Sequence, residues 1–197
     1  MIHIYIDEAG RGPLAGPVYV GLILWNKSGK AKEFKSYKDS KKLSERQRET
    51  LFAQLEQSNI LRSYGKSSAA YIDKNGIVSA IRWAIVQGVK RLILKPDWST
   101  ITLHIDGNTD FGLRKKFPWI TICTYIKGDD RIPAISAASI IAKVSRDREM
   151  LKLDKEHSSY GFAQHKGYGT QQHRIMIATH WLSSIHRKSF CKNIVVL

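Results

Sequence analysis

Cysteines and long apolar runs are the scarcest features of this sequence. Its 197 residues include only Cys123 and Cys191, without a Cys-x-x-Cys spacing, so neither a disulfide framework nor a cysteine metal site is indicated. No apolar run approaches the roughly 20 residues that a membrane-spanning helix needs. The first strand-like run begins at Ile2 with no charged leader before it. We therefore expect a soluble, unprocessed protein in a reducing cytoplasm.

Acidic residues are also few, and the C-terminal end has none. Seventeen Asp and Glu stand against 32 Lys and Arg, which gives a formal net charge of +15. Residues 157–197 contain no acid, five Lys or Arg, and five of the seven histidines. This balance favours an anionic polymer as partner, with nucleic acid ahead of an anionic membrane surface.

Hydrophobic periodicity predicts one α/β domain. Strands are predicted at 2–7, 18–25, 60–67, 101–106 and 119–126, the first two as a hairpin. Helices are predicted after Ser44, where Gln47 completes a capping box and Leu51 and Leu55 face inward, and at 77–90, 133–157 and 171–184. No linker or repeat interrupts this order. We therefore expect a single domain over residues 1–197, with 157–197 as a basic C-terminal helical appendage.

Three local patterns resemble known binding motifs but do not meet the requirements of those motifs. Gly10, Gly12 and Gly16 follow a strand, but a strand rather than a helix comes next, which excludes a dinucleotide-binding turn. Residues 65–67 read Gly-Lys-Ser, yet Ile60 stands where a phosphate-binding loop needs its first glycine. The C-terminal histidines lack a zinc-ligand spacing, and we expect most of them to face solvent or to bond locally.

Carboxylates follow three of the predicted strands. Asp7 ends the first predicted strand, and Asp106 ends the predicted strand Leu103–Asp106. Because side chains alternate between the two faces of a strand, the position of each aspartate fixes the face on which its carboxylate lies. If these strands are parallel neighbours, the two acids converge. Asp129 follows another strand, and reactive groups of open α/β sheets gather at such ends. A strand-terminal Asp is more often a turn former or helix cap, so this structural explanation stays open for each one alone.

Clustered carboxylates need protons or cations to offset their repulsion. Hard oxygen ligands suit Mg²⁺ or Mn²⁺, which also bind substrate phosphates. An acidic cluster within a +15 protein therefore suggests a nuclease, in which two metals activate water and stabilise the leaving oxygen.

Six sequence blocks carry a resemblance that covers nearly the whole chain. They are DEAGRGPLAGPV at 7–18, DSKKLS at 39–44, HIDG at 104–107, KGD at 127–129, ISAASIIAKVSRD at 135–147 and HKGYGT at 165–170. In this order they resemble the type 2 ribonucleases H, in particular the bacterial ribonuclease HII branch. The resemblance implies a ribonuclease H-like fold, with a mixed central β-sheet flanked by helices and a helical C-terminal extension.

The resemblance also implies an activity and a cofactor. Members of this family cut the RNA strand of RNA/DNA hybrids and incise duplex DNA at embedded ribonucleotides, leaving 3′-hydroxyl and 5′-phosphate ends. The metal-binding carboxylates would be Asp7, Glu8, Asp106 and Asp129, holding Mg²⁺ or Mn²⁺, two ions when substrate is bound. Asp130 is an alternative to Asp129, which occupies the motif position.

Substrate contacts follow from the same blocks. The resemblance assigns recognition of the ribose 2′-hydroxyl to the backbone of Gly10, Arg11 and Gly12, together with Tyr168. Glycines allow such a close backbone approach, although a loop tyrosine on its own is more often a packing anchor.

The remaining expected contacts are with phosphates. Lys143 belongs to a helical stripe with Ser136, Ser139 and Arg146, and the resemblance makes it a phosphate contact. Without the resemblance, that stripe would be a solvated helix face. Lys41 and Lys42 are expected to contact backbone phosphates.

Two qualifications concern the acids. Glu8 points away from Asp7 in a regular strand, so its participation requires the chain to bend, which Gly10 and Gly12 make inexpensive. Asp147 is expected to form a salt bridge or to support the site rather than bind metal.

Two other functions remain possible on the sequence alone. One is a non-catalytic nucleic-acid-binding module, and the other is a different nuclease of the ribonuclease H superfold, such as a resolvase or integrase. The expected partners are RNA/DNA hybrid and ribonucleotide-containing duplex DNA. No membrane and no obligate protein partner is expected, and the chain should be a monomer.

Overall fold

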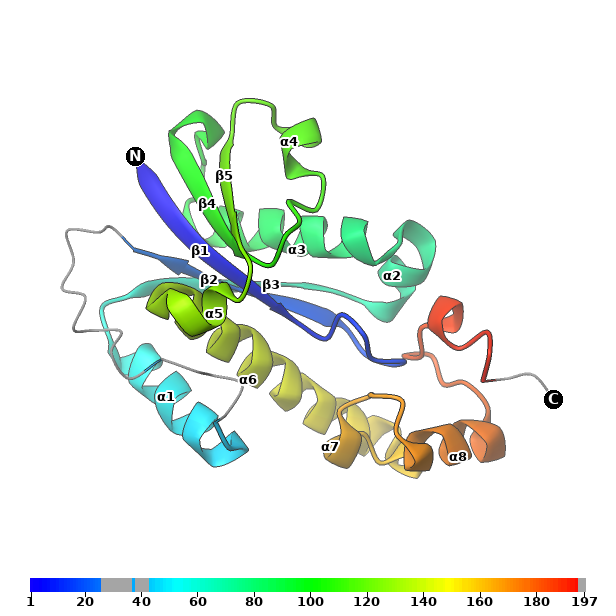
Figure 1. The fold of residues 1–197 in the computed structure, drawn as a ribbon. Coiled ribbons are helices and arrows are strands. Elements are labelled where there is room, and N and C mark those ends of the chain that lie inside the picture. Colours follow the sequence, from blue (N-terminus) through cyan, green and yellow to red (C-terminus); the bar gives the residue numbers. More distant parts are fainter. Residues whose placement is uncertain (26–36, 38–42, 195–197) are drawn as a thin grey trace.

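A five-stranded mixed sheet forms the centre of the protein (Figure 1). The computed structural model describes residues 1–25, 37 and 43–194. The strand order is β3-β2-β1-β4-β5, where β1 pairs antiparallel with β2 and parallel with β4. The strands are β1 (Ile2–Ala9), β2 (Val18–Leu24), β3 (Leu61–Ser67), β4 (Ile101–Asp106) and β5 (Thr121–Tyr125). The central position of β1 puts its C-terminal end beside that of β4.

Helices cover both faces of this sheet. The α-helices are α1 (Glu45–Gln57), α2 (Ala69–Asn75), α3 (Ile77–Leu92), α4 (Leu113–Lys116), α5 (Gly128–Arg131), α6 (Pro133–Glu156), α7 (Phe162–His165) and α8 (Gln171–His180). Figure 1 shows α3 on one face and α6 on the other, with α1 beside α6. Within the described residues, no helix is long and apolar enough to cross a membrane.

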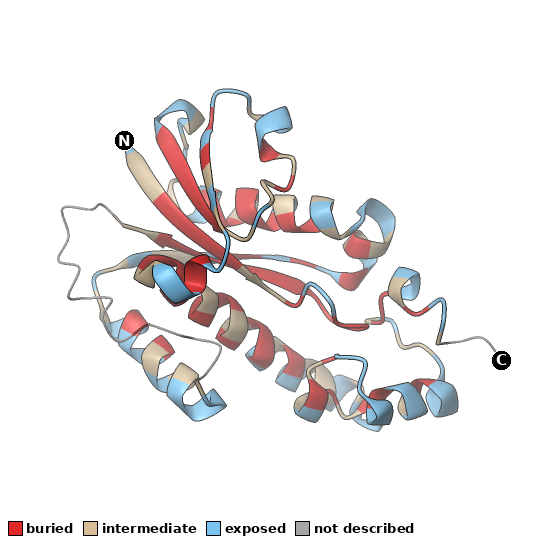
Figure 2. Cartoon of the chain, in the orientation of Figure 1, coloured by how far each residue is buried: buried red, intermediate tan, exposed pale blue. Residues whose placement is uncertain are grey.

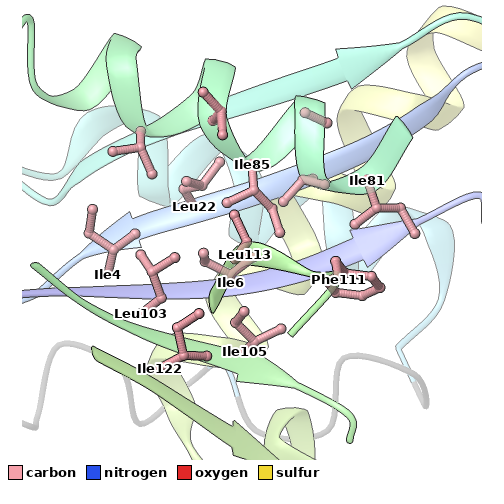
Figure 3. Close-up of a cluster of buried hydrophobic side chains, with 14 of the residues drawn as sticks. Ile4, Ile6, Leu22, Ile81, Ile85, Leu103, Ile105, Phe111, Leu113 and Ile122 are labelled. Atoms are coloured by element: carbon pink, nitrogen blue, oxygen red, sulfur yellow. The ribbon is translucent and has the colours of Figure 1, made fainter. Parts of the chain in front are cut away.

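Alternation along β1 divides its side chains between two cores. Ile4 and Ile6 pack toward α3 in the cluster of Figure 3, together with Ile81 and Ile85. Tyr5 belongs to the second cluster, which lies against α6. Both helices carry many buried residues, which Figure 2 colours red. By the same alternation, Asp7 faces α6.

Two glycines allow the helices to lie directly on the strands. A Cβ on Gly21 of β2 would lie 2.0 Å from the carbonyl oxygen of Ala138 in α6. A Cβ on Gly65 of β3 would lie 1.8 Å from the carbonyl oxygen of Ala84 in α3. Because both obstructing atoms belong to backbone, neither helix can accommodate a larger residue without moving as a whole.

Most predicted elements are confirmed, including the capping box at Ser44 and Pro133 in the first turn of α6. In α1 Leu55 is fully buried and Leu51 packs against the same cluster, as predicted, and Phe52 is buried beside them. Other details were wrong. β5 is shorter than predicted, and α8 ends at His180 because Trp181 adopts a positive φ of 64°. The short helices α2, α4, α5 and α7 were not predicted, since each has too few residues to show a period.

We expect Gly21→Ala to lower the free energy of unfolding by about 1–3 kcal/mol, because the new methyl group overpacks the β2–α6 contact. Urea denaturation measures this. Gly12→Ala is the matched control, since a Cβ there has no neighbour within 4 Å. Equal stability of the two variants would show that α6 does not rest on the sheet at Gly21.

Candidate active site

Three aspartates meet at the C-terminal edge of the sheet. The parallel register of β1 and β4 pairs Ile6 with Ile105, which places Asp7 and Asp106 next to each other. Asp129 joins them from α5, the single turn that follows β5. One carboxylate oxygen from each lies within 4.8 Å of the others. The convergence expected from strand parity is therefore confirmed.

Local backbone geometry fixes the position of Asp129 relative to Asp106. The chain turns at Lys127, which adopts a positive φ of 55°, and α5 begins at the next residue. The N–H of Gly128 donates to Oδ1 of Asp106 at 2.6 Å. A Cβ at Gly128 would lie 2.8 Å from Cδ1 of Ile135, so the turn packs tightly against α6.

The electrostatics of the cluster favour a bound cation. Asp7 is buried, and this burial raises the pKa of its carboxyl well above the usual value, with further increases from the charges of Glu8 and Asp106. Hydrogen bonds from the Ser139 hydroxyl and from the N–H of Glu8 act in the opposite direction. Because every donor in the group is a carboxylate oxygen, the residues fit a hard divalent cation such as Mg²⁺ or Mn²⁺.

Glu8 lies beside this cluster without joining it. Its residue still belongs to β1, paired with Val20, and the chain bends only at Gly10, where φ is 89°. Among the described residues, the group of converging oxygens therefore contains three aspartates and not Glu8. Glu8 instead lies 3.6 Å from the guanidinium of Arg11 and lines the same cleft as Asp7.

The neighbouring acids take other positions. Asp130 is exposed, whereas Asp129 is 1% exposed, so the structure turns the motif aspartate toward the cluster. Asp147 accepts a hydrogen bond from Nζ of Lys143 at 3.0 Å, one turn earlier on α6. This is the salt bridge expected for Asp147.

A cleft of about 410 Å³ opens over Asp7 and Asp106. One wall consists of the backbone from Ala9 to Gly12, and the other carries Ser139 and Lys143 of α6. Tyr168 and Arg48 complete the lining. The cleft therefore combines acids with cationic side chains, and Arg48 is a lining residue that the motifs did not indicate. Lys41 and Lys42 lie outside the described residues.

Tyr168 is not a packing anchor. The residue is 43% exposed. The Lys143 ammonium lies 5.9 Å from the centroid of the Tyr168 ring, and the Arg146 guanidinium lies 5.6 Å from the same centroid. Two cations at this distance orient the aromatic face. Tyr168 therefore lines the cleft while its ring contacts two cationic side chains.

The structure also identifies two buried arginines that the sequence did not. Arg146 is fully buried, so the solvated-face interpretation of its helical stripe was wrong. Its guanidinium donates to the carbonyls of Pro17 and Lys166 at 3.0 and 2.8 Å, which connects the loops after β1 and α7. Arg187 is also fully buried, and it bonds the first of these loops. No motif signals either contact, because the acceptors are backbone carbonyls.

Three of the C-terminal histidines, His165, His173 and His186, are buried, and each bonds a group within five residues, which is the local bonding expected for them. The N–H of Ser183 lies 2.9 Å from Nδ1 of His186, which must therefore accept. His186 then donates from Nε2 to Nε2 of His173 at 3.0 Å. His173 in turn donates from Nδ1 to the carbonyl of Tyr168 at 2.9 Å. His165 stacks on His173, with ring centroids 4.3 Å apart.

This chain of hydrogen bonds requires neutral rings. Burial lowers the pKa of both His173 and His186 to about 4. Each ring acts as both donor and acceptor, a pattern that only the neutral imidazole offers. The backbone of Tyr168 is thereby fixed to the C-terminal segment.

Comparisons with known proteins identify a family for this chain. A family model described as Ribonuclease HII matches residues 4–193. A Ribonuclease HII of Aliivibrio fischeri (strain MJ11) is 40% identical over 187 residues, covering 94% of this chain and 84% of the relative. A Ribonuclease HII of Campylobacter concisus (strain 13826) is 42% identical over 186 residues, covering 94% and 90%.

Solved structures show the same architecture. The ribonuclease H2 of Pyrococcus horikoshii OT3 matches with a TM-score of 0.76 and 26% identity, covering 98% of this chain and 97% of that one. The RNase HII of Archaeoglobus fulgidus, solved in a complex with PCNA, matches with a TM-score of 0.75 and 25% identity, covering 95% and 94%.

The buried histidines predict a pH dependence of stability. Both have folded-state pKa values near 4, below the unfolded value of about 6.5, so the unfolded chain binds protons that the folded chain does not. We expect the free energy of unfolding to fall as the pH drops from about 6.5 toward 4, by up to about 3 kcal/mol for one histidine. Urea denaturation at pH 7 and pH 5 measures the loss.

His173→Gln should lose less stability between pH 7 and pH 5 than the parent, because one titrating group is gone. His180→Gln, at an exposed position, should retain the full loss. Identical pH dependence in all three proteins would contradict the neutral histidine chain.

Proposed function

The chain belongs to the ribonuclease HII family, a family of hydrolytic endoribonucleases, and we propose that its reaction takes place in the cleft over Asp7, Asp106 and Asp129. The observation that carries this proposal is the convergence of three carboxylates, two of which, Asp7 and Asp106, line a cleft that also carries cationic side chains. Type 2 ribonucleases H cut the RNA strand of RNA/DNA hybrids and incise duplexes at embedded ribonucleotides. A non-catalytic binding module is set aside, since the family is enzymatic.

We assign metal binding to Asp7, Asp106 and Asp129, with Glu8 at the edge of the cluster as a fourth carboxylate. The ions are Mg²⁺ or Mn²⁺, two in number when substrate is bound. Divalent ions held by these carboxylates would supply an activated water molecule and stabilise the leaving 3′-oxygen, which would give 3′-hydroxyl and 5′-phosphate ends. The Gly128 N–H and the Ser139 hydroxyl hold the carboxylates of Asp106 and Asp7 in place.

Substrate contacts are assigned to the cleft walls. The backbone of Gly10, Arg11 and Gly12 and the side chain of Tyr168 contact the ribose, and its 2′-hydroxyl separates RNA from DNA. Lys143 contacts a phosphate near the scissile bond, supported by its position on the α6 wall. Lys41 and Lys42 remain predicted phosphate contacts. We further propose that the protein is a cytoplasmic monomer and that it acts in DNA replication and repair.

The two adjacent aspartates of α5 provide the sharpest test. Asp129→Asn should reduce cleavage by several orders of magnitude, because it removes one converging charge with almost no change in shape, whereas exposed Asp130→Asn should keep it. The assay uses a labelled DNA duplex with one ribonucleotide, in Mg²⁺ and separately in Mn²⁺. An intact strand with folded wild-type protein, or equal activity of the two variants, would overturn the assignment.

Tyr168 is tested by separating its ring from its hydroxyl. Tyr168→Ala should lower the rate at a single ribonucleotide by about tenfold or more, since the ring positions the sugar. Tyr168→Phe keeps the ring between Lys143 and Arg146 and should retain more activity. Single-turnover rates under saturating enzyme give the comparison. Unchanged rates in both variants would make Tyr168 a bystander in the cleft.

A further inference from the structure

Arg187 binds the loop after β1 with all arms of its guanidinium. Nη2 donates to the carbonyl of Gly10 at 2.7 Å, Nη1 to that of Arg11 at 3.1 Å, and Nε to that of Gly16 at 3.0 Å. The backbone N–H of Arg187 also donates to the carbonyl of Leu14 at 2.7 Å. Figure 1 shows this C-terminal segment beside the loop after β1. One side chain thus satisfies three carbonyls of one loop.

These contacts determine where the loop directs its N–H groups. All peptide bonds here are trans among the described residues, so a carbonyl and the N–H of the next residue point in opposite directions. The carbonyls of Gly10 and Arg11 point to Arg187, in the interior. The N–H groups of Arg11 and Gly12 therefore point away from Arg187, and both residues line the cleft. Two neighbouring donors in this arrangement suit an oxygen acceptor.

The same C-terminal segment also holds the second substrate element. His186, adjacent to Arg187, begins the hydrogen-bond path through His173 to the carbonyl of Tyr168. On its other side, Asp73 of α2 accepts from the N–H groups of Lys188 and Ser189 at 2.8 and 2.9 Å. The segment is therefore fixed at both ends between α2 and the Tyr168 loop. Its position sets the distance between the two elements that line the cleft.

We propose that Arg187 is a positioning residue for ribonucleotide recognition, which orients the Arg11 and Gly12 peptide groups toward the sugar and keeps them in register with Tyr168. This inference rests on the proposed function, since it assigns Arg187 a role in ribose selection by that cleft.

The Arg187 guanidinium is suited to this role, although burying its charge destabilises the folded state. Burial, together with the nearby charge of Arg146, lowers the pKa of Arg187 to about 9. A buried charge is weak support for stability, because desolvation offsets much of what its hydrogen bonds contribute. A rigid fork of donors, however, fixes several carbonyls in one geometry, which a lysine ammonium does not. The contact is thus better explained by the orientation of the loop than by its net stabilisation.

The test compares Arg187→Gln and Arg187→Lys with Arg62→Gln. Arg62 is the matched control, because it also donates to two carbonyls, those of Ile60 and Glu56, at the far end of β3. Affinities are measured by fluorescence anisotropy for a DNA duplex with one ribonucleotide and for the same duplex without it. All proteins carry Asp129→Asn so that the strand stays intact, and cleavage rates come from the same variants without it.

We expect the parent to prefer the ribonucleotide duplex and both Arg187 variants to lose most of that preference. Their cleavage at the single ribonucleotide should fall by about tenfold to a hundredfold. Arg62→Gln should keep preference and rate even where its melting temperature falls equally. If Arg187→Gln does not fold, Arg187→Lys, which retains the charge, decides the result.

Folded Arg187 variants with the parental preference and rate would overturn the inference, as would an equal loss in Arg62→Gln. A wild-type protein that leaves the ribonucleotide duplex intact would instead contradict the proposed function, and the two failures are thereby distinguished.

Discussion

Repulsion among three converging carboxylates is the constraint on which this structure depends. Asp7, Asp106 and Asp129 come from three different elements, and no local contact within one element holds them together. Like charges in a buried setting separate unless the surrounding backbone is rigid or a cation is bound. The sheet supplies this rigidity because Gly21 and Gly65 let α6 and α3 clamp it at backbone contact. The close packing of both helices on the sheet therefore also holds the three acids close together.

Helix α6 connects the core to every part of the cleft. Three members of its polar stripe, Ser136, Ser139 and Arg146, bond other segments, and Lys143 bonds Asp147 of α6 itself. Ser136 donates to the carbonyl of Tyr37, Ser139 bonds Asp7, and Lys143 lines the cleft above Asp147. Arg146 then bridges the loops that carry Gly10 and Tyr168. The helix thereby connects Asp7 and the loops that carry Gly10 and Tyr168 to the core that its apolar residues form.

How much the sequence predicts depends on the range of the contact. Strand parity placed Asp7 next to Asp106 correctly, because a period of two is a geometric property of the strand itself. The helix from Pro133 was equally clear, since its start signal is local. Arg187 was not predictable, because its acceptors are carbonyls 171 to 177 residues earlier in the chain. Backbone acceptors leave no side-chain pattern, and a basic C-terminal segment looks the same whether its arginine is solvated or buried.

The positions of the two buried arginines, Arg146 and Arg187, follow from the conformation of the loop after β1. Glycine at position 10 supplies the positive φ that ends β1, and a Cβ there would lie 2.1 Å from Nε of Arg146. The backbone of this loop is held by hydrogen bonds in both directions: the N–H groups of Leu14 and Gly16 donate to the carbonyls of Gly167 and Ile185, and other carbonyls of the loop accept from two buried arginines. Arg146 of α6 bonds the carbonyl of Pro17, and Arg187 of the C-terminal segment bonds that of Gly10. Glycine and buried arginine are therefore complementary in this loop: glycine permits the positive φ, and the arginines limit the freedom that glycine brings.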